Sequence, residues 1–260
     1  MRILIVGAGA TGGYFGGRLA QAGRDITFLV RPKRAAQLRD MGLQLLSPHG
    51  DVTVQPQLVT ADQIAGPYDA VLITVKAFGL DAAMADIAKA VGPHTMIMPV
   101  LNGMRHLDAL IARFGETPVL GGVCLVASMI DPEGRIKQLA GFQSLIYGER
   151  NGAMSGRVEA LDAALKDAGF EARASSSIMQ EMWEKWILLA TMGAITCLMR
   201  GTVGEIEAAP GGAGLALQVL EECCAVSKAS GYPVGDAFLT RTKAAVTSKG
   251  SPSAPSMYRD

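Results

Sequence analysis

The chain contains 260 residues, of which 49% are hydrophobic and 18% are charged, so it is long and apolar enough to bury a large core. Its 24 basic and 24 acidic side chains give a formal net charge of zero, which lends no support to binding of nucleic acid or of a membrane surface. Composition and charge together predict a globular protein whose partner is a small molecule. The four cysteines lack C-x-x-C spacing, so the sequence predicts no metal site.

The N-terminus reads as a strand, a glycine turn, a helix and a second strand. Residues 3–6 are an apolar run suited to a strand buried on both faces, and residues 26–30 are a second such run. Between them, Gly7, Gly9 and Gly12 have G-x-G-x-x-G spacing, in which the second glycine admits a pyrophosphate and the helix N-terminus stabilises it. The alternative is a purely structural turn, since a chain with 31 glycines produces this spacing by chance. The predicted dinucleotide-binding residues are Gly7, Ala8, Gly9, Ala10, Thr11 and Gly12.

The end of the second strand indicates which dinucleotide is bound. An NAD site usually places Asp or Glu there to bind the ribose 2′-hydroxyl, but this chain has Arg31, and Asp25 lies at the other end of the strand. Lys33 and Arg34 add positive charge where a 2′-phosphate would lie. The sequence therefore predicts NADP as the cofactor, with a solvated basic loop as the alternative.

Further strands follow in the first half of the chain. Residues 43–46 and 52–54 suggest a hairpin appended to the nucleotide fold. Residues 69–75 read as a buried strand, residues 80–91 as a helix, and residues 95–101 as another strand. Antiparallel members are then expected from the remaining runs, at residues 119–130, 135–139 and 144–147.

Four candidate binding residues follow predicted parallel strands directly. In an open α/β sheet ligands bind at the carboxyl ends of the strands, and Gly7, Arg31, Lys76 and Asn102 all fall at such ends. Taken singly, Lys76 reads equally well as an ordinary cation at a strand end, and Asn102 before Gly103 as a normal turn pair. Their shared position makes them candidates for the cofactor site.

From residue 155 onward the pattern becomes helical. Periodic apolar residues predict helices over residues 182–199, 215–230 and 236–247, so we expect residues 1–154 to form the nucleotide-binding domain and residues 155–260 an all-helical second domain. Lys185 lies at the head of an apolar run between Trp183 and Trp186, where a partly desolvated ammonium could donate a proton. A lysine that extends from the helix end into solvent is the alternative.

We expect a cytoplasmic protein, because Met1 leads straight into the first strand and no apolar run reaches the roughly 20 residues that span a bilayer.

The chain resembles the ketopantoate reductase family of NADP-dependent enzymes, which are similar in plan to the 6-phosphogluconate and hydroxyacid dehydrogenases. The matching features are Gly7-x-Gly9-x-x-Gly12 with Arg31, Thr74-Val75-Lys76, Leu101-Asn102-Gly103-Met104, Trp183-Glu184-Lys185, Glu222 before Gly231, and Ser256-Met257-x-x-Asp260. The resemblance implies an α/β protein with a Rossmann-type N-terminal domain and an all-helical C-terminal domain. It also implies NADPH-dependent reduction of 2-dehydropantoate to pantoate, a step of pantothenate and coenzyme A biosynthesis.

The same resemblance implies roles for individual residues. Lys185 would be the general acid, and Asn102 would contact both cofactor and substrate. Lys76 would lie near the nicotinamide ribose, and Ser256 would bind the carboxylate of the 2-oxo acid substrate.

Two departures from the family pattern affect these expectations. Leu189, Gly193 and Val203 stand where typical members carry asparagines that hold the polar end of ketopantoate. A reductase of a different branched 2-oxo acid or β-hydroxy acid is therefore an alternative, and a non-catalytic NADPH sensor is another. The chain also stops at Asp260, earlier than relatives do, so we expect a shortened helical domain with exposed apolar surface. That surface should either form a homodimer, which we favour, or be covered by residues absent from this chain.

Overall fold

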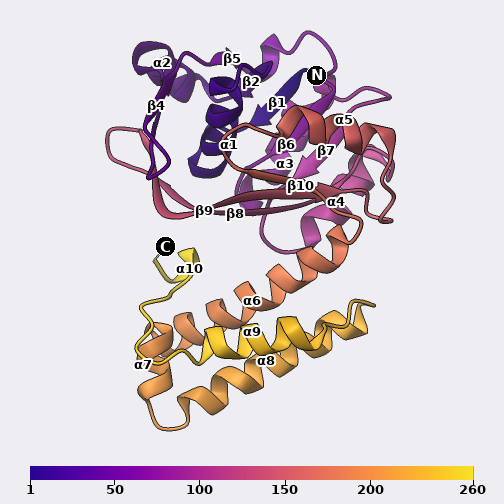
Figure 1. The fold of residues 1–260 in the computed structure, drawn as a ribbon. Coiled ribbons are helices and arrows are strands. Elements are labelled where there is room, and N and C mark those ends of the chain that lie inside the picture. The colour runs from indigo at the N-terminus through magenta and orange to yellow at the C-terminus, as the bar shows by residue number, and fades with distance from the viewer. Residues whose placement is uncertain (260) are drawn as a thin grey trace. The chain divides into compact units, whose positions relative to one another are not determined.

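The computed structural model describes residues 1–259 and divides the chain into two compact units, Met1–Ile178 and Met179–Asp260 (Figure 1). Asp260, the last residue of the predicted serine motif, lies outside the described residues. The division follows Ile178, whereas the sequence predicts a boundary after residue 154. The reason is that α5 (Gly156–Leu165) packs in the core of the first unit and β10 (Glu171–Ala174) pairs with its second sheet.

The first sheet of the N-terminal unit is wholly parallel. Its strands lie in the order β5-β2-β1-β6-β7, so the chain begins in the middle of the sheet. They are β1 (Ile3–Val6), β2 (Ile26–Leu29), β5 (Gln57–Val59), β6 (Ala70–Ile73) and β7 (Met96–Pro99). Every residue of β1, β2, β6 and β7 is buried, as expected for parallel strands covered on both faces. This sheet confirms the predicted α/β class.

A second sheet is built around the long strand β9 (Ile136–Gly148). One edge of β9 pairs in parallel with both β3 (Leu43–Leu46) and β10, and its other edge pairs antiparallel with β8 (Gly121–Ile130). The predicted hairpin is present, because β4 (Val52–Val54) runs antiparallel to β3. The hairpin belongs to this second sheet and not to the parallel sheet that contains β1. The two strands expected at residues 135–139 and 144–147 are one continuous strand.

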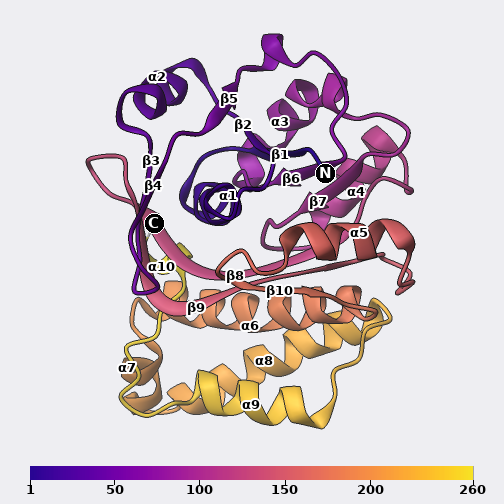
Figure 2. The ribbon, with the colours of Figure 1, turned by 45° about the horizontal axis from the view of Figure 1, so that its top comes forward.

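Helix α1 (Ala10–Gln21) lies between the two sheets (Figure 2). Its glycines make this position possible. A Cβ on Gly16 would lie 2.6 Å from the Phe28 ring in the first sheet, and a Cβ on Gly17 would lie 2.9 Å from Leu45 in the second. Because neither site has room for a side chain, both sheets approach the helix closely and share one apolar core with it.

The remaining helices of the first unit connect its strands. They are α2 (Pro32–Met41), α3 (Leu80–Asp86) and α4 (Arg105–Phe114). The helix predicted over residues 80–91 ends at Asp86 and continues as a short 3-10 turn over Ala88–Ala90.

The second unit is helical, as the sequence predicts. Its elements are α6 (Ile178–Met199), α7 (Val203–Ala208), α8 (Gly212–Ala229), α9 (Asp236–Val246) and α10 (Ser256–Arg259). The first four share a core that includes Ile187, Ile206, Leu220 and Phe238. Among residues 1–259, no helix has both the length and the apolar character needed to cross a membrane.

Candidate cofactor and catalytic site

The glycine turn after β1 is held by contacts that only glycine permits. Gly7 has φ +98°, a conformation that other residues rarely adopt, and its N–H donates to the Leu29 carbonyl at 3.0 Å. The Thr74 hydroxyl, which follows β6, donates to the carbonyls of Val6 at 2.8 Å and Gly7 at 3.2 Å. A Cβ on Gly12 would collide with both the Gly7 carbonyl and this hydroxyl. Gly12 therefore lets α1 begin directly against the strand ends.

The space above Gly9, by contrast, is open. Gly9 is the N-cap of α1 with ordinary φ of −84°, and a Cβ built on it would meet no atom within 4 Å. No side chain caps the helix there, and its first turn contains no acidic residue. The N–H groups of the first helical turn and the positive end of the helix dipole thus point toward open space, where an anionic pyrophosphate could bind.

Two side chains from distant parts of the chain brace this turn. Arg34 of α2 donates through Nε to the Ala8 carbonyl at 3.2 Å and through Nη1 to the Gly134 carbonyl at 3.0 Å. Ser128 of β8 donates its hydroxyl to the Ala10 carbonyl at 3.1 Å. Burial lowers the pKa of Arg34, and its Nη2 is buried with no partner among the described residues. Sequence reasoning missed this bracing, because nothing local relates Gly134 or Ser128 to residues 8–10.

The basic residues after β2 therefore divide into two kinds. Arg31 and Lys33 are exposed at the start of α2, where Arg31 is the N-cap, so both are accessible to a ligand. Arg34 was expected to assist at a 2′-phosphate, but its Nε and Nη1 donors are engaged by the protein. Arg31 remains the candidate for recognising a phosphate at the end of this strand.

The predicted residues of the first unit do come to one edge of the sheet. Gly7, Arg31, Lys76 and Asn102 follow β1, β2, β6 and β7, four strands that are neighbours in parallel order. Lys76 and Asn102 are exposed. The side chain of Phe78, two residues after Lys76, is 92% exposed and adds an aromatic surface near this edge. This edge of the sheet thus brings together the glycine turn, two cationic side chains, the Asn102 amide and the Phe78 ring.

Lys185 lies in the second unit, on α6, and is half-buried. The aromatic rings on either side of it in sequence pack together, with the centroids of Trp183 and Trp186 separated by 5.3 Å. Trp183 also stacks on Tyr232, which follows α8, at 5.9 Å. These contacts fix the segment of helix that carries the lysine.

The short helix α10 lies against the same helix. A Cβ on Gly193 would collide with the terminal methyl of Met257, so Met257 occupies the space that the glycine leaves. Ser256, next to it, is exposed. Val203 is fully buried at the start of α7, where its N–H donates to the Ser253 carbonyl at 3.0 Å, and Glu222 is exposed on α8. Val203 is therefore a core residue rather than part of a surface.

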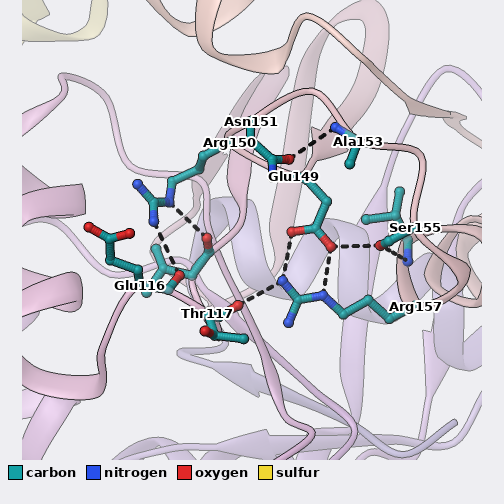
Figure 3. A network of polar contacts seen from close by, with 10 residues as sticks. Glu116, Thr117, Glu149, Arg150, Asn151, Ala153, Ser155 and Arg157 are labelled. Atoms are coloured by element: carbon teal, nitrogen blue, oxygen red, sulfur yellow. Dashed lines mark hydrogen bonds and ion pairs between the residues drawn. The ribbon is translucent and has the colours of Figure 1, made fainter.

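A polar cleft of about 720 Å³ lies elsewhere in the first unit. Arg157 makes a bidentate ion pair with Glu149 at 2.6 Å (Figure 3), and this contact lowers the pKa of Glu149. Arg150 donates to the carbonyls of Val119 and Glu116. These residues surround the amino end of β7, whereas Asn102 follows its carboxyl end. The guanidinium contacts are internal ties between loops, at the end of the strand opposite the glycine turn.

Comparison with known proteins agrees with this architecture. Residues 3–152 match the model of the family described as "Ketopantoate reductase PanE/ApbA", and residues 177–260 match the model of its C-terminal part. "Uncharacterized oxidoreductase YkpB" of Bacillus subtilis is 36% identical over 260 residues, covering all of this chain and 86% of that protein. The 2-dehydropantoate 2-reductase of Mesorhizobium japonicum is 29% identical over 259 residues, covering 90% of this chain and 79% of its own length.

Solved structures give the same result. That of 2-dehydropantoate 2-reductase from Geobacter metallireducens matches all of this chain and 86% of its own, with a TM-score of 0.88 and 29% identity. D-mandelate dehydrogenase with NADH and anilino(oxo)acetate matches all of this chain and 85% of its own, with a TM-score of 0.87. Its 20% identity shows a shared fold alone. From the two family models and these relatives we conclude that the chain belongs to the ketopantoate reductase PanE/ApbA family of oxidoreductases.

Proposed function

We propose that this protein is an NADPH-dependent reductase of a short branched 2-oxo acid, with 2-dehydropantoate as the reference substrate. The observation that carries the proposal is the glycine turn, where Gly12 is sterically required and Gly9 leaves open space at a helix N-terminus. Residues 7–12 would hold the cofactor pyrophosphate. Arg31 would bind the 2′-phosphate, and Lys76 and Asn102 would lie near the nicotinamide ribose.

The residues of the chain suit one reaction, in which a ketone becomes a secondary alcohol. NADPH, when bound, supplies the hydride that the carbonyl carbon accepts. Lys185 donates a proton to the carbonyl oxygen as negative charge develops there, and Asn102 donates a hydrogen bond that orients the reacting groups. Ser256 binds the substrate carboxylate. The product is the corresponding 2-hydroxy acid.

The assignment of Lys185 is tested by the variant Lys185→Ala. A general acid contributes about 10²–10⁴-fold, so turnover of 2-oxo acids should fall by this factor while NADPH affinity stays unchanged. Lys228→Ala, which removes an exposed lysine from α8, is the matched control and should retain full turnover. An unchanged rate in Lys185→Ala would remove this residue from the mechanism.

Two alternatives make different predictions. Leu189 and Gly193 favour a substrate other than 2-dehydropantoate, which a panel of 2-oxo and β-hydroxy acids would reveal. A non-catalytic NADPH sensor would bind the cofactor tightly and reduce no member of the panel. A homodimer formed by the helical unit remains a prediction, and sedimentation of the purified chain would test it.

A further inference from the structure

Arg34, on α2, links the glycine turn to the loop that connects β8 and β9. Its Nε donates to the Ala8 carbonyl, and its Nη1 donates to the Gln37 side chain at 2.6 Å and to the Gly134 carbonyl at 3.0 Å. Its third nitrogen, Nη2, is buried. The guanidinium is thus turned toward the protein on every side. An effect of Arg34 on cofactor binding must therefore pass through the residues that it contacts.

A tight turn holds the Gly134 carbonyl in place. Gly134 donates its N–H to the Asp131 carbonyl at 2.9 Å, and the Arg135 guanidinium pairs with the Asp131 carboxylate at 2.7 Å. Gly134 has φ +84°, and a Cβ on it would collide with the Gln37 amide, so the turn lies directly against α2. Arg34 is therefore anchored on one side by this turn, and from there it restrains the glycine turn on the other side.

The contact at Ala8 also sets the direction of the next N–H group. The Ala8 carbonyl and the Gly9 N–H belong to one planar trans peptide, in which they point in opposite directions. Gly9 places few limits on rotation of this peptide, because it has no side chain and no atom lies within 4 Å of where its Cβ would stand. The open space that would admit a pyrophosphate thus leaves the peptide without a local restraint, and Arg34 supplies one from α2.

We propose that Arg34 is a positioning residue, which holds the Ala8–Gly9 peptide in the orientation that binds the cofactor pyrophosphate and does not itself contact the cofactor. The inference rests on the proposed function, because it takes the glycine turn as the cofactor site. NADPH and NADH share the pyrophosphate, whereas only NADPH carries a 2′-phosphate. Arg34 therefore controls the affinity for both cofactors to the same degree, in contrast to Arg31.

Calorimetric titration of Arg34→Ala with each cofactor tests this role. The Kd should rise about tenfold for NADPH and NADH alike, because a turn that keeps the binding orientation for only about a tenth of the time binds about tenfold more weakly. Arg39→Ala removes the same charge from an exposed position of α2 and should leave both Kd values unchanged. A loss confined to NADPH would overturn the proposal, since Arg34 would then act on the 2′-phosphate.

Two further measurements separate positioning from simple attraction between charges. Arg34→Lys keeps the positive charge but lacks the planar fork that reaches two carbonyls, so its Kd should also rise about tenfold for both cofactors. Wild-type affinity in this variant would show that charge alone is responsible. Adenosine 2′-monophosphate has the 2′-phosphate but no pyrophosphate, so wild type and Arg34→Ala should bind it equally. A tenfold loss for this compound would contradict action through the glycine turn.

Thermal unfolding of each variant without cofactor shows whether it is folded at the temperature of the titration. Arg34→Lys changes the side-chain volume little, so it keeps the test available if Arg34→Ala does not fold. If the wild type binds neither cofactor, the proposed function itself is wrong. If the wild type binds NADPH and folded Arg34 variants bind it with the same affinity, the cofactor site stands and only the role of Arg34 is lost.

Discussion

Gly9 and Gly12 should respond in opposite ways to the same substitution. In Gly12→Ala the new methyl would collide with the Gly7 carbonyl and the Thr74 hydroxyl, one of which is backbone and cannot move freely. Overpacking of this kind costs about 1–3 kcal/mol, and the better helix propensity of alanine returns about 1 kcal/mol. Because the Gly7 carbonyl is a backbone atom, the upper end of this range applies and the net loss is about 2 kcal/mol, which corresponds to a Tm lower by about 4–8 °C in a unit of this size.

In Gly9→Ala the methyl would enter open space. Alanine is a poorer N-cap than glycine, which costs about 0.5 kcal/mol and lowers Tm by less than about 2 °C. The same methyl would occupy the space proposed for the pyrophosphate, so the Kd for NADPH should rise at least about tenfold. The expected pattern is a stable Gly9→Ala variant that binds cofactor poorly, beside a destabilised Gly12→Ala variant.

Thermal unfolding followed by circular dichroism and calorimetric titration with NADPH measure these two effects. Both tryptophans, Trp183 and Trp186, lie on α6 in the second unit, so their emission monitors that unit separately. Equal destabilisation in both variants would refute the reasoning about open space. Wild-type NADPH affinity in Gly9→Ala would show that the pyrophosphate does not approach this glycine.

Three further predictions concern single side chains. Arg31→Ala should weaken NADPH binding by about 1.5–3 kcal/mol and barely affect NADH, as measured by titration with each cofactor, and equal losses would contradict recognition of the 2′-phosphate. Arg157 lowers the pKa of Glu149, so this ion pair stabilises the folded state at pH values above the ordinary carboxyl pKa. The stabilisation is lost as pH falls and Glu149 becomes protonated. The difference in unfolding free energy between wild type and Glu149→Gln should therefore shrink as pH falls below about 5, and urea titrations showing a constant difference would argue against it. Tyr147→Phe removes a donor to Asp162 at 2.8 Å and should cost about 1.5 kcal/mol in the same assay, where no loss would mean that the bond adds nothing.

Local pattern was enough to predict the glycine turn that forms the candidate nucleotide site. A buried strand, three glycines at fixed spacing and a following helix are adjacent in sequence, so one short segment contains the whole turn. The positions of Arg31, Lys76 and Asn102 were also predictable, because residues that follow neighbouring parallel strands must reach the same edge of the sheet. The helical character of the second half followed from its apolar periodicity.

Tertiary structure decided what depends on contacts between distant segments. Strand β9 gathers β3, β8 and β10 into a second sheet, which places α1 between two layers and moves the division of the chain to Ile178. Ser128 reaches the Ala10 carbonyl, and Met257 fills the space at Gly193. No periodicity encodes these pairings, since each one depends on which surfaces of separate elements meet once the core has formed. The sequence by itself thus determined the elements and the strand ends at which the candidate residues gather, while packing between the elements determined how the glycine turn is braced and how Met257 covers Gly193.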